Sequence, residues 1–76
     1  MKEEEIVEVL KKDNEQFRRL YQEHRTLDKQ ISELNKKSYL TADEEVEKKR
    51  IQKEKLHKKD MIAELIREYK KTHNNH

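Results

Sequence analysis

Histidines are the residues of this 76-residue chain that most readily bind metals or move protons near neutral pH. His73 and His76 stand three positions apart at the end of the chain, a spacing that brings two imidazoles to one face of a helix. A zinc site needs at least three protein ligands held in fixed geometry. The pair therefore predicts no metal site, and we interpret it as part of a solvated tail.

His24 occupies a polar position within an otherwise apolar series of heptad spacing. One hypothesis is that it sets the register of a helix pair or senses pH near neutrality. The other is a half-buried histidine that is satisfied by a neighbouring side chain, as buried polar groups usually are. We favour the second interpretation.

Asp28 and Asp60 are carboxylates that can pair with lysines such as Lys55 or Lys59 across a helix or subunit interface. A catalytic pair is the alternative, and it requires a cleft that raises the pKa of one carboxyl group. A two-helix hairpin has little material for such a cleft, and the chain has neither a nucleophile motif nor a glycine-rich phosphate loop. We therefore expect no catalytic residue, no bound cofactor and no enzymatic activity.

A run of cations forms the most basic part of the chain, with seven lysines and arginines between residues 48 and 59. Contact with a phosphate backbone requires such cations to gather on one face. Here they spread around a predicted helix, and no aromatic residue lies among them to stack on a base. Nucleic-acid association is therefore possible in principle but not favoured, and its candidate contacts are Lys48, Lys49, Arg50 and Lys53.

The composition limits what the chain can build. Asp, Glu, Lys and Arg make up 47% of it, the net charge is only +2, and it has no Gly, Pro or Cys. A disulfide framework is excluded, and a core this small rarely provides more than about 3–5 kcal/mol of stability. The apolar runs are too short to cross a bilayer, and residues 1–5 do not resemble a signal peptide. We expect a cytoplasmic protein that does not enter membranes and associates with itself.

Heptad spacing predicts the elements that position these residues. Two series run along the first half of the chain: Leu10, Phe17, His24 and Ile31, and three residues later Asp13, Leu20, Leu27 and Leu34. Such a seam is typical of a helix packed lengthwise on another helix. Asp13-Asn14 predicts a kink or break through which the heptad phase continues, and Thr41 with Glu44 predicts a strong helix start.

The expected fold is all-α: a single domain over residues 1–76, formed by an antiparallel helical hairpin with coiled-coil-like packing. Helices are predicted at about 3–12, 14–36 and 42–71, with a short kinked N-terminal helix, a loop at about 36–41 and a frayed tail at 72–76. The predicted seam comprises Leu10, Phe17, Leu20, His24, Leu27, Ile31, Leu34, Ile51, Ile62, Leu65 and Tyr69, with Ile66 on the same stripe.

A turn near Ser38 and Tyr39 sets the expected register, in which facing residue numbers sum to roughly 79. This register places Phe17 against Ile62, Leu27 against Ile51 and Leu10 against Tyr69. Apolar residues that point away from the seam suggest a second interface, most simply a homodimer that completes a small helical bundle. The candidates for this partner surface are Val46, Leu56 and Met61.

Three short motifs resemble the YdcH-like family of small bacterial proteins: Phe17-x-x-Leu20, His24-x-x-Leu27-Asp28 and Lys55-Leu56-x-x-Lys59-Asp60-x-Ile62. The resemblance covers roughly residues 13–66. Two positions depart from the family pattern, because Lys58 stands where an apolar residue is common and Glu15-Gln16 where a proline often precedes the Phe. The resemblance implies a helical hairpin in a bacterial cytoplasm, and it implies no catalytic residue or ligand.

The function that these observations favour is a small, non-enzymatic helical module that binds another protein by burying an apolar stripe against a partner helix. Nucleic-acid association through the basic stretch is the alternative. The partner is expected to be a second copy of the chain, and any further protein partner stays unknown.

Overall fold

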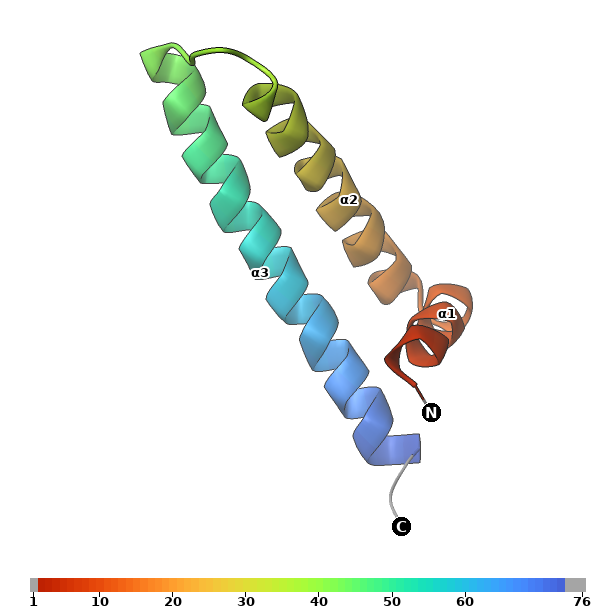
Figure 1. The fold of residues 1–76 in the computed structure, drawn as a ribbon. Helices are drawn as coiled ribbons and strands as arrows, with labels where there is room; N and C mark the ends of the chain where they lie inside the picture. Colours follow the sequence, from red (N-terminus) through yellow and green to blue (C-terminus); the bar gives the residue numbers. More distant parts are fainter. Residues whose placement is uncertain (1, 74–76) are drawn as a thin grey trace.

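The fold is all-helical, as predicted. The computed structural model describes residues 2–73, and this part of the chain forms three α-helices: α1 (Glu3–Asp13), α2 (Glu15–Asn35) and α3 (Ala42–His73). α2 and α3 lie side by side and run in opposite directions from the connection at 36–41 (Figure 1). The molecule is elongated, with extents of 53 × 20 × 16 Å.

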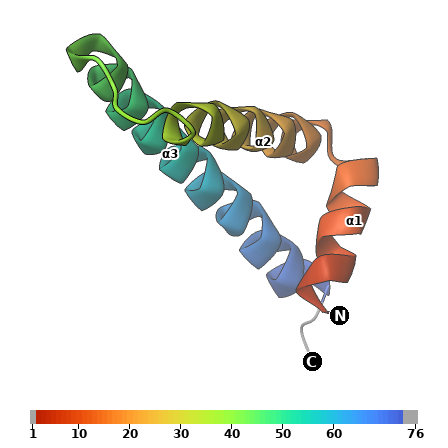
Figure 2. The ribbon, with the colours of Figure 1, turned by 45° about the horizontal axis from the view of Figure 1, so that its top comes forward.

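α1 does not continue the line of α2. In Figure 2 it turns away from α2 and closes the open end between α2 and the C-terminal part of α3. The cause is Asn14, whose backbone is extended (φ −124°, ψ 108°) and whose Oδ1 accepts a hydrogen bond of 3.0 Å from Phe17 N–H. Asn side chains favour this N-cap position because they satisfy an amide that the helix leaves free.

The predicted break at Asp13-Asn14 is therefore present, but the heptad phase does not continue through it. Asp13, which was placed in the seam series, is exposed at the end of α1. Leu10 is buried, yet it lies on α1 and reaches the core from a different direction than the seam residues of α2. A helix keeps its phase only while its backbone stays helical, and one extended residue is enough to redirect it.

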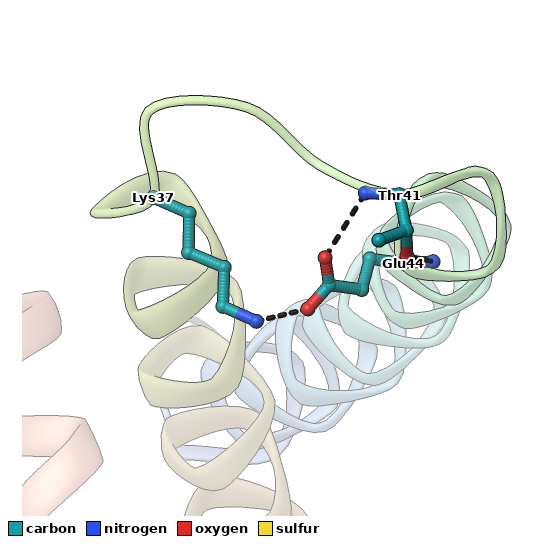
Figure 3. Close-up of polar contacts among 3 residues, drawn as sticks. All are labelled: Lys37, Thr41 and Glu44. Carbon is teal, nitrogen blue, oxygen red and sulfur yellow. Dashed lines mark hydrogen bonds and ion pairs between the residues drawn. The ribbon is translucent and has the colours of Figure 1, made fainter.

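The connection between α2 and α3 is closed by the predicted capping box. Glu44 N–H donates to Thr41 Oγ1 (3.1 Å), and Thr41 N–H donates to Glu44 Oε1 (3.0 Å), so each residue satisfies a free amide of the other. The other Glu44 oxygen forms an ion pair with Lys37, which lies in the connection just after α2 (Figure 3). The hydrogen bond from Lys37, followed by that from Thr41 N–H, holds the pKa of Glu44 below its ordinary value.

The largest cluster of buried side chains lies where all three helices meet. Phe17 and Ile6 are 0% and 1% exposed, and they pack with Leu10 and Ile66. Half-buried residues surround this cluster: Val7, Tyr21, Ile62, Leu65 and Tyr69. Nearer to the connection, Leu20, Ile31 and Ile51 are buried between α2 and α3. Of the remaining predicted seam, His24, Leu27 and Leu34 are half-buried.

Ile6 is the core residue that the predicted seam lacks. The signal was present in the sequence, because Ile6 and Leu10 are four residues apart and lie on one face of a helix. What the sequence could not show is that this face meets Phe17 and Ile66 rather than solvent.

The register of the hairpin differs slightly from the predicted one. Three ion pairs cross to α3: Lys37–Glu44, Glu23–Lys58 at 3.1 Å and Asp28–Lys55 at 2.6 Å. In each pair the residue numbers sum to two to four more than the predicted value. The backbone accounts for the direction of this offset, because Lys36 and Lys37 N–H still donate to the carbonyls at the end of α2, so helical hydrogen bonding continues past Asn35.

α3 extends beyond its predicted end. Thr72 and His73 are helical, although the sequence predicts a frayed tail for both. Thr72 Oγ1 donates to Glu68 O (2.9 Å), and the His73 ring stacks on Tyr69 with 3.9 Å between ring centroids. The rest of the predicted tail, 74–76, lies outside the described residues.

Candidate interaction surface

The most exposed large apolar side chains on α3 are Val46 and Leu56. They are 68% and 58% exposed, whereas Ile51, midway between them, is 3% exposed and faces α2. Five residues along a helix correspond to a rotation of about 140°. Val46 and Leu56 therefore both lie on the side of α3 away from Ile51, which we call the outer face. Leu56 is at the edge of this face, where it lines a groove together with Ile31 of α2.

Met61, the third residue of the predicted partner surface, lies elsewhere. It is half-buried, and its position along α3 places it at the side of the helix nearer to α2. The structure thus brings two of the three predicted residues to one exposed face.

Four further residues share the outer face with Val46 and Leu56 at heptad spacing, and the predicted partner surface does not include them. Two series alternate there: Val46, Lys53 and Asp60, and Lys49, Leu56 and Ala63. All six side chains are exposed. We call this set the outer stripe. Its signal in the sequence is the repeat of seven, which is weak because four of the six residues are charged or small.

The predicted nucleic-acid contacts do not form a uniform set of free cations. Arg50 pairs with Glu47 and, at 2.7 Å, with Glu54, and the hydrogen bond and charge of Glu47 raise its pKa above the ordinary value. Lys48 is half-buried. Lys49 and Lys53 remain exposed, and neither forms an ion pair with any residue in 2–73.

The two predicted carboxylates have different environments. Asp28 accepts a hydrogen bond of 2.6 Å from Lys55 on α3, and this bond, together with the Lys55 charge, holds the pKa of Asp28 below its ordinary value of 3.8. Asp60 is exposed on the outer stripe and has no ion-pair partner within the described chain. The interhelical ion pair expected for Asp28 is therefore present. It is solvent-exposed, so it orients the helices more than it stabilises them.

His24 is half-buried in α2, as expected, but its Nε2 atom is buried without a hydrogen-bond partner in the described structure. The expectation that a neighbouring side chain satisfies the ring is therefore wrong for this nitrogen. His73 Nδ1 lies 3.1 Å from Tyr69 O, and His76 lies outside the described residues. Within 2–73, the structure contains no group of three or more His, Asp or Glu side chains that could hold a metal ion.

The grooves of the hairpin are open to solvent. One groove between α2 and α3 has a volume of about 520 Å³, and Leu27 is its one apolar lining residue among arginine, glutamate, glutamine, lysine and threonine. Small-molecule sites are usually enclosed and mostly apolar. Among the described helices, none combines the length and apolarity needed to span a bilayer.

Comparison with known proteins gives the family. Residues 17–66 match the model of a family described as a protein of unknown function, DUF465. The chain belongs to this family. The match covers most of α2, the connection and α3 up to Ile66, so the DUF465 region is the hairpin itself, and α1 lies outside it. Neither the curated proteins nor the solved structures gave a match. The likeness to YdcH-like proteins in particular, and a bacterial origin, stay predictions.

Proposed function

We propose that this DUF465 protein is a non-enzymatic helical module that binds a partner helix along the outer stripe of α3. The observation that supports the proposal is the exposure of Val46 and Leu56 on the long helix. The other large aliphatic residues of α3 are buried or half-buried against α2 and α1. A partner helix can bury such side chains when they share one face of an otherwise charged helix, as in helix-in-groove recognition.

The strength of the binding follows from the size of this face. Burial of a Val or Leu side chain contributes about 1.5–3 kcal/mol, and the loss of translational freedom on association offsets much of that gain. A partner held by two such residues and a rim of charges is therefore bound weakly and reversibly. Weak, reversible association is typical of an adaptor.

Affinity capture tests the proposal. The tagged protein is recovered from its native cells with and without nuclease, and the bound proteins are identified by mass spectrometry. We expect partners that survive nuclease and are lost with Leu56→Asp. The matched control is Tyr39→Asp, because Tyr39 is 83% exposed but lies on the connection; this variant should keep the same partners. Equal recovery with wild type and Leu56→Asp would contradict the proposal.

Nucleic-acid association through the basic stretch stays the alternative, with fewer candidate contacts than the sequence suggested. Two of the four cations, Lys49 and Lys53, are exposed and unpaired within 2–73. Affinity through phosphate contacts would fall steeply with salt and would weaken in the Lys49→Gln and Lys53→Gln variants. The absence of any shift at low salt would end this alternative.

A further inference from the structure

The charges of the outer stripe are ordered along the helix. Lys49 and Lys53 lie on the N-terminal side of Leu56, and Asp60 lies on its C-terminal side. Residues three or four apart are neighbours on a helix surface, so the stripe is one continuous line from Val46 to Ala63. Its cationic half and its anionic end are separated by an apolar side chain.

These three charges are unpaired within the described structure, unlike several neighbours on the same helix. Lys55 and Lys58 bind carboxylates of α2, Arg50 binds Glu47 and Glu54, and Arg67 binds Glu64 at 2.6 Å. Lys49, Lys53 and Asp60 form no ion pair with a residue in 2–73. The stripe therefore has both signs of charge available to a partner.

Only one direction of self-pairing matches these charges. If two α3 helices met in parallel, Lys49, Lys53 and Asp60 would each face the same residue of the other copy, and like charges repel. In an antiparallel pair the order reverses, so the cationic half of one stripe lies over the anionic end of the other. Such an interface is isologous, and each favourable contact occurs twice.

We propose that the partner of the outer stripe is a second copy of this chain, bound through an antiparallel α3–α3 contact in which Lys49 faces Asp60 of the second copy. In the same register Val46 meets Ala63 of the second copy, and Leu56 packs on the aliphatic stem of Lys53 of the second copy. The inference rests on the proposed function and names its partner.

Sedimentation equilibrium across low-micromolar to millimolar concentrations tests the pairing with a charge exchange. We expect the wild type to dimerise, with a dissociation constant that increases with ionic strength. Lys49→Glu and Asp60→Lys should each weaken the dimer at least tenfold, whereas the double variant Lys49→Glu/Asp60→Lys should recover wild-type association. Lys70→Glu, which changes an exposed lysine of α3 beyond the end of the stripe, is the matched control and should change little. Circular dichroism of each variant verifies that the helices persist.

Disulfide trapping supplies an independent test, because the chain contains no cysteine. Oxidation of the Val46→Cys/Ala63→Cys variant should give a covalent dimer, whereas Val46→Cys alone should stay unlinked. The two positions cannot join within one chain, because 17 residues of α-helix span about 25 Å. A dimer trapped by Val46→Cys alone would indicate parallel pairing and overturn the inference.

A wild type that stays monomeric at every concentration, or a double charge variant that does not recover association, would likewise overturn it. The outcome for the proposed function is separate. Suppose that the protein is monomeric but still captures partners that survive nuclease and that depend on Leu56. The dimer proposal would then be wrong, whereas the proposed function as an interaction module would be supported. If Leu56→Asp still self-associated and still captured the same partners, the proposed interaction module would be overturned as well.

Discussion

At the scale of single residues, the hairpin contains one polar atom that is poorly accommodated. His24 Nε2 is buried without a hydrogen-bond partner in the described structure, although Asp28, one turn further along α2, is engaged with Lys55. An unsatisfied buried polar group costs about 1–3 kcal/mol relative to one that keeps its hydrogen bond. We therefore expect a histidine at this position to weaken the packing of α2 on α3.

Replacement of this histidine should stabilise the fold. We expect His24→Leu to increase the free energy of unfolding by about 1 kcal/mol, measured by urea denaturation at neutral pH, because the variant removes the unsatisfied nitrogen and keeps an apolar side chain. His57→Leu, at an exposed position of α3, is the control and should stay within about 0.5 kcal/mol of the wild type. A decrease in the free energy of unfolding of His24→Leu would mean that the imidazole ring makes a stabilising contact in the folded protein.

The Asp28–Lys55 ion pair predicts a specific pH dependence. The pKa of Asp28 is lowered in the folded state, so its contribution to stability is fully present above the unfolded-state value near 3.8 and is lost as the pH falls through the lower folded-state value. We expect Asp28→Asn to lower the melting temperature at pH 7 and to have no effect in strong acid. In a Lys55→Gln background, Asp28→Asn should have little effect at either pH. If the melting temperatures of the wild type and Asp28→Asn differed as much in strong acid as at pH 7, the proposed dependence on the charge of Asp28 would be wrong.

At the scale of elements, the ends of the helices are fixed by short, local interactions. Asn14 begins α2 by accepting from Phe17 N–H, and Thr41 and Glu44 begin α3 by exchanging two hydrogen bonds. The chain has no Gly, and α2 ends without a left-handed residue, through backbone N–H groups of Lys36 and Lys37 that donate to Glu33 O and Leu34 O. The starts of α2 and α3 therefore each depend on one or two side chains.

The capping box should be sensitive to loss of one hydroxyl group. Thr41→Ala is expected to lower the free energy of unfolding by about 1 kcal/mol, because the amide of Glu44 loses its acceptor. Ser38→Ala removes a hydroxyl from the same connection at an exposed position and serves as the control, with an expected change near zero. Chemical denaturation followed by circular dichroism measures both. Equal losses in the two variants would show that the connection, and not the cap, limits stability.

At the scale of the whole molecule, stability depends on a small core at one end of a long hairpin. α1 meets α2 and α3 around Phe17, and the remaining length of the hairpin is held by three buried residues and by exposed ion pairs. A domain of this size has little stability to lose. The N-terminal helix, although outside the matched DUF465 region, therefore supplies a substantial part of the folded state's core.

Ile6→Ala tests this role of α1. Ile6 is 1% exposed, and truncation of such a side chain costs about 2–5 kcal/mol, comparable to the whole stability expected of so small a domain. We expect a large fall in melting temperature and a loss of helical signal at room temperature. Leu56→Ala, at low protein concentration, removes a similar side chain from the exposed stripe and should have little effect. A folded, stable Ile6→Ala variant would show that the hairpin needs no support from α1.

The sequence by itself determined the helices of this protein, because the signals that specify them are local. Heptad spacing marked α2, and the residues around Asn14 and Thr41 marked the two starts, since a cap acts within four residues of its own position. The pairing of α2 with α3 followed from the shortness of the connection. The lysine partner of Asp28 was among the two that the sequence proposed.

Only the tertiary structure decided how these helices meet. One extended residue at Asn14 gave α1 a direction that no heptad count could show, and it made Ile6 a core residue. Backbone hydrogen bonds continue past Asn35 to Lys37, and the ion pairs between α2 and α3 are shifted from the predicted register. Arg50 is paired with Glu47 and Glu54, so it is not a free cation. Angles between helices and the choice among competing partners depend on residues far apart in sequence, so they are settled only when the helices pack.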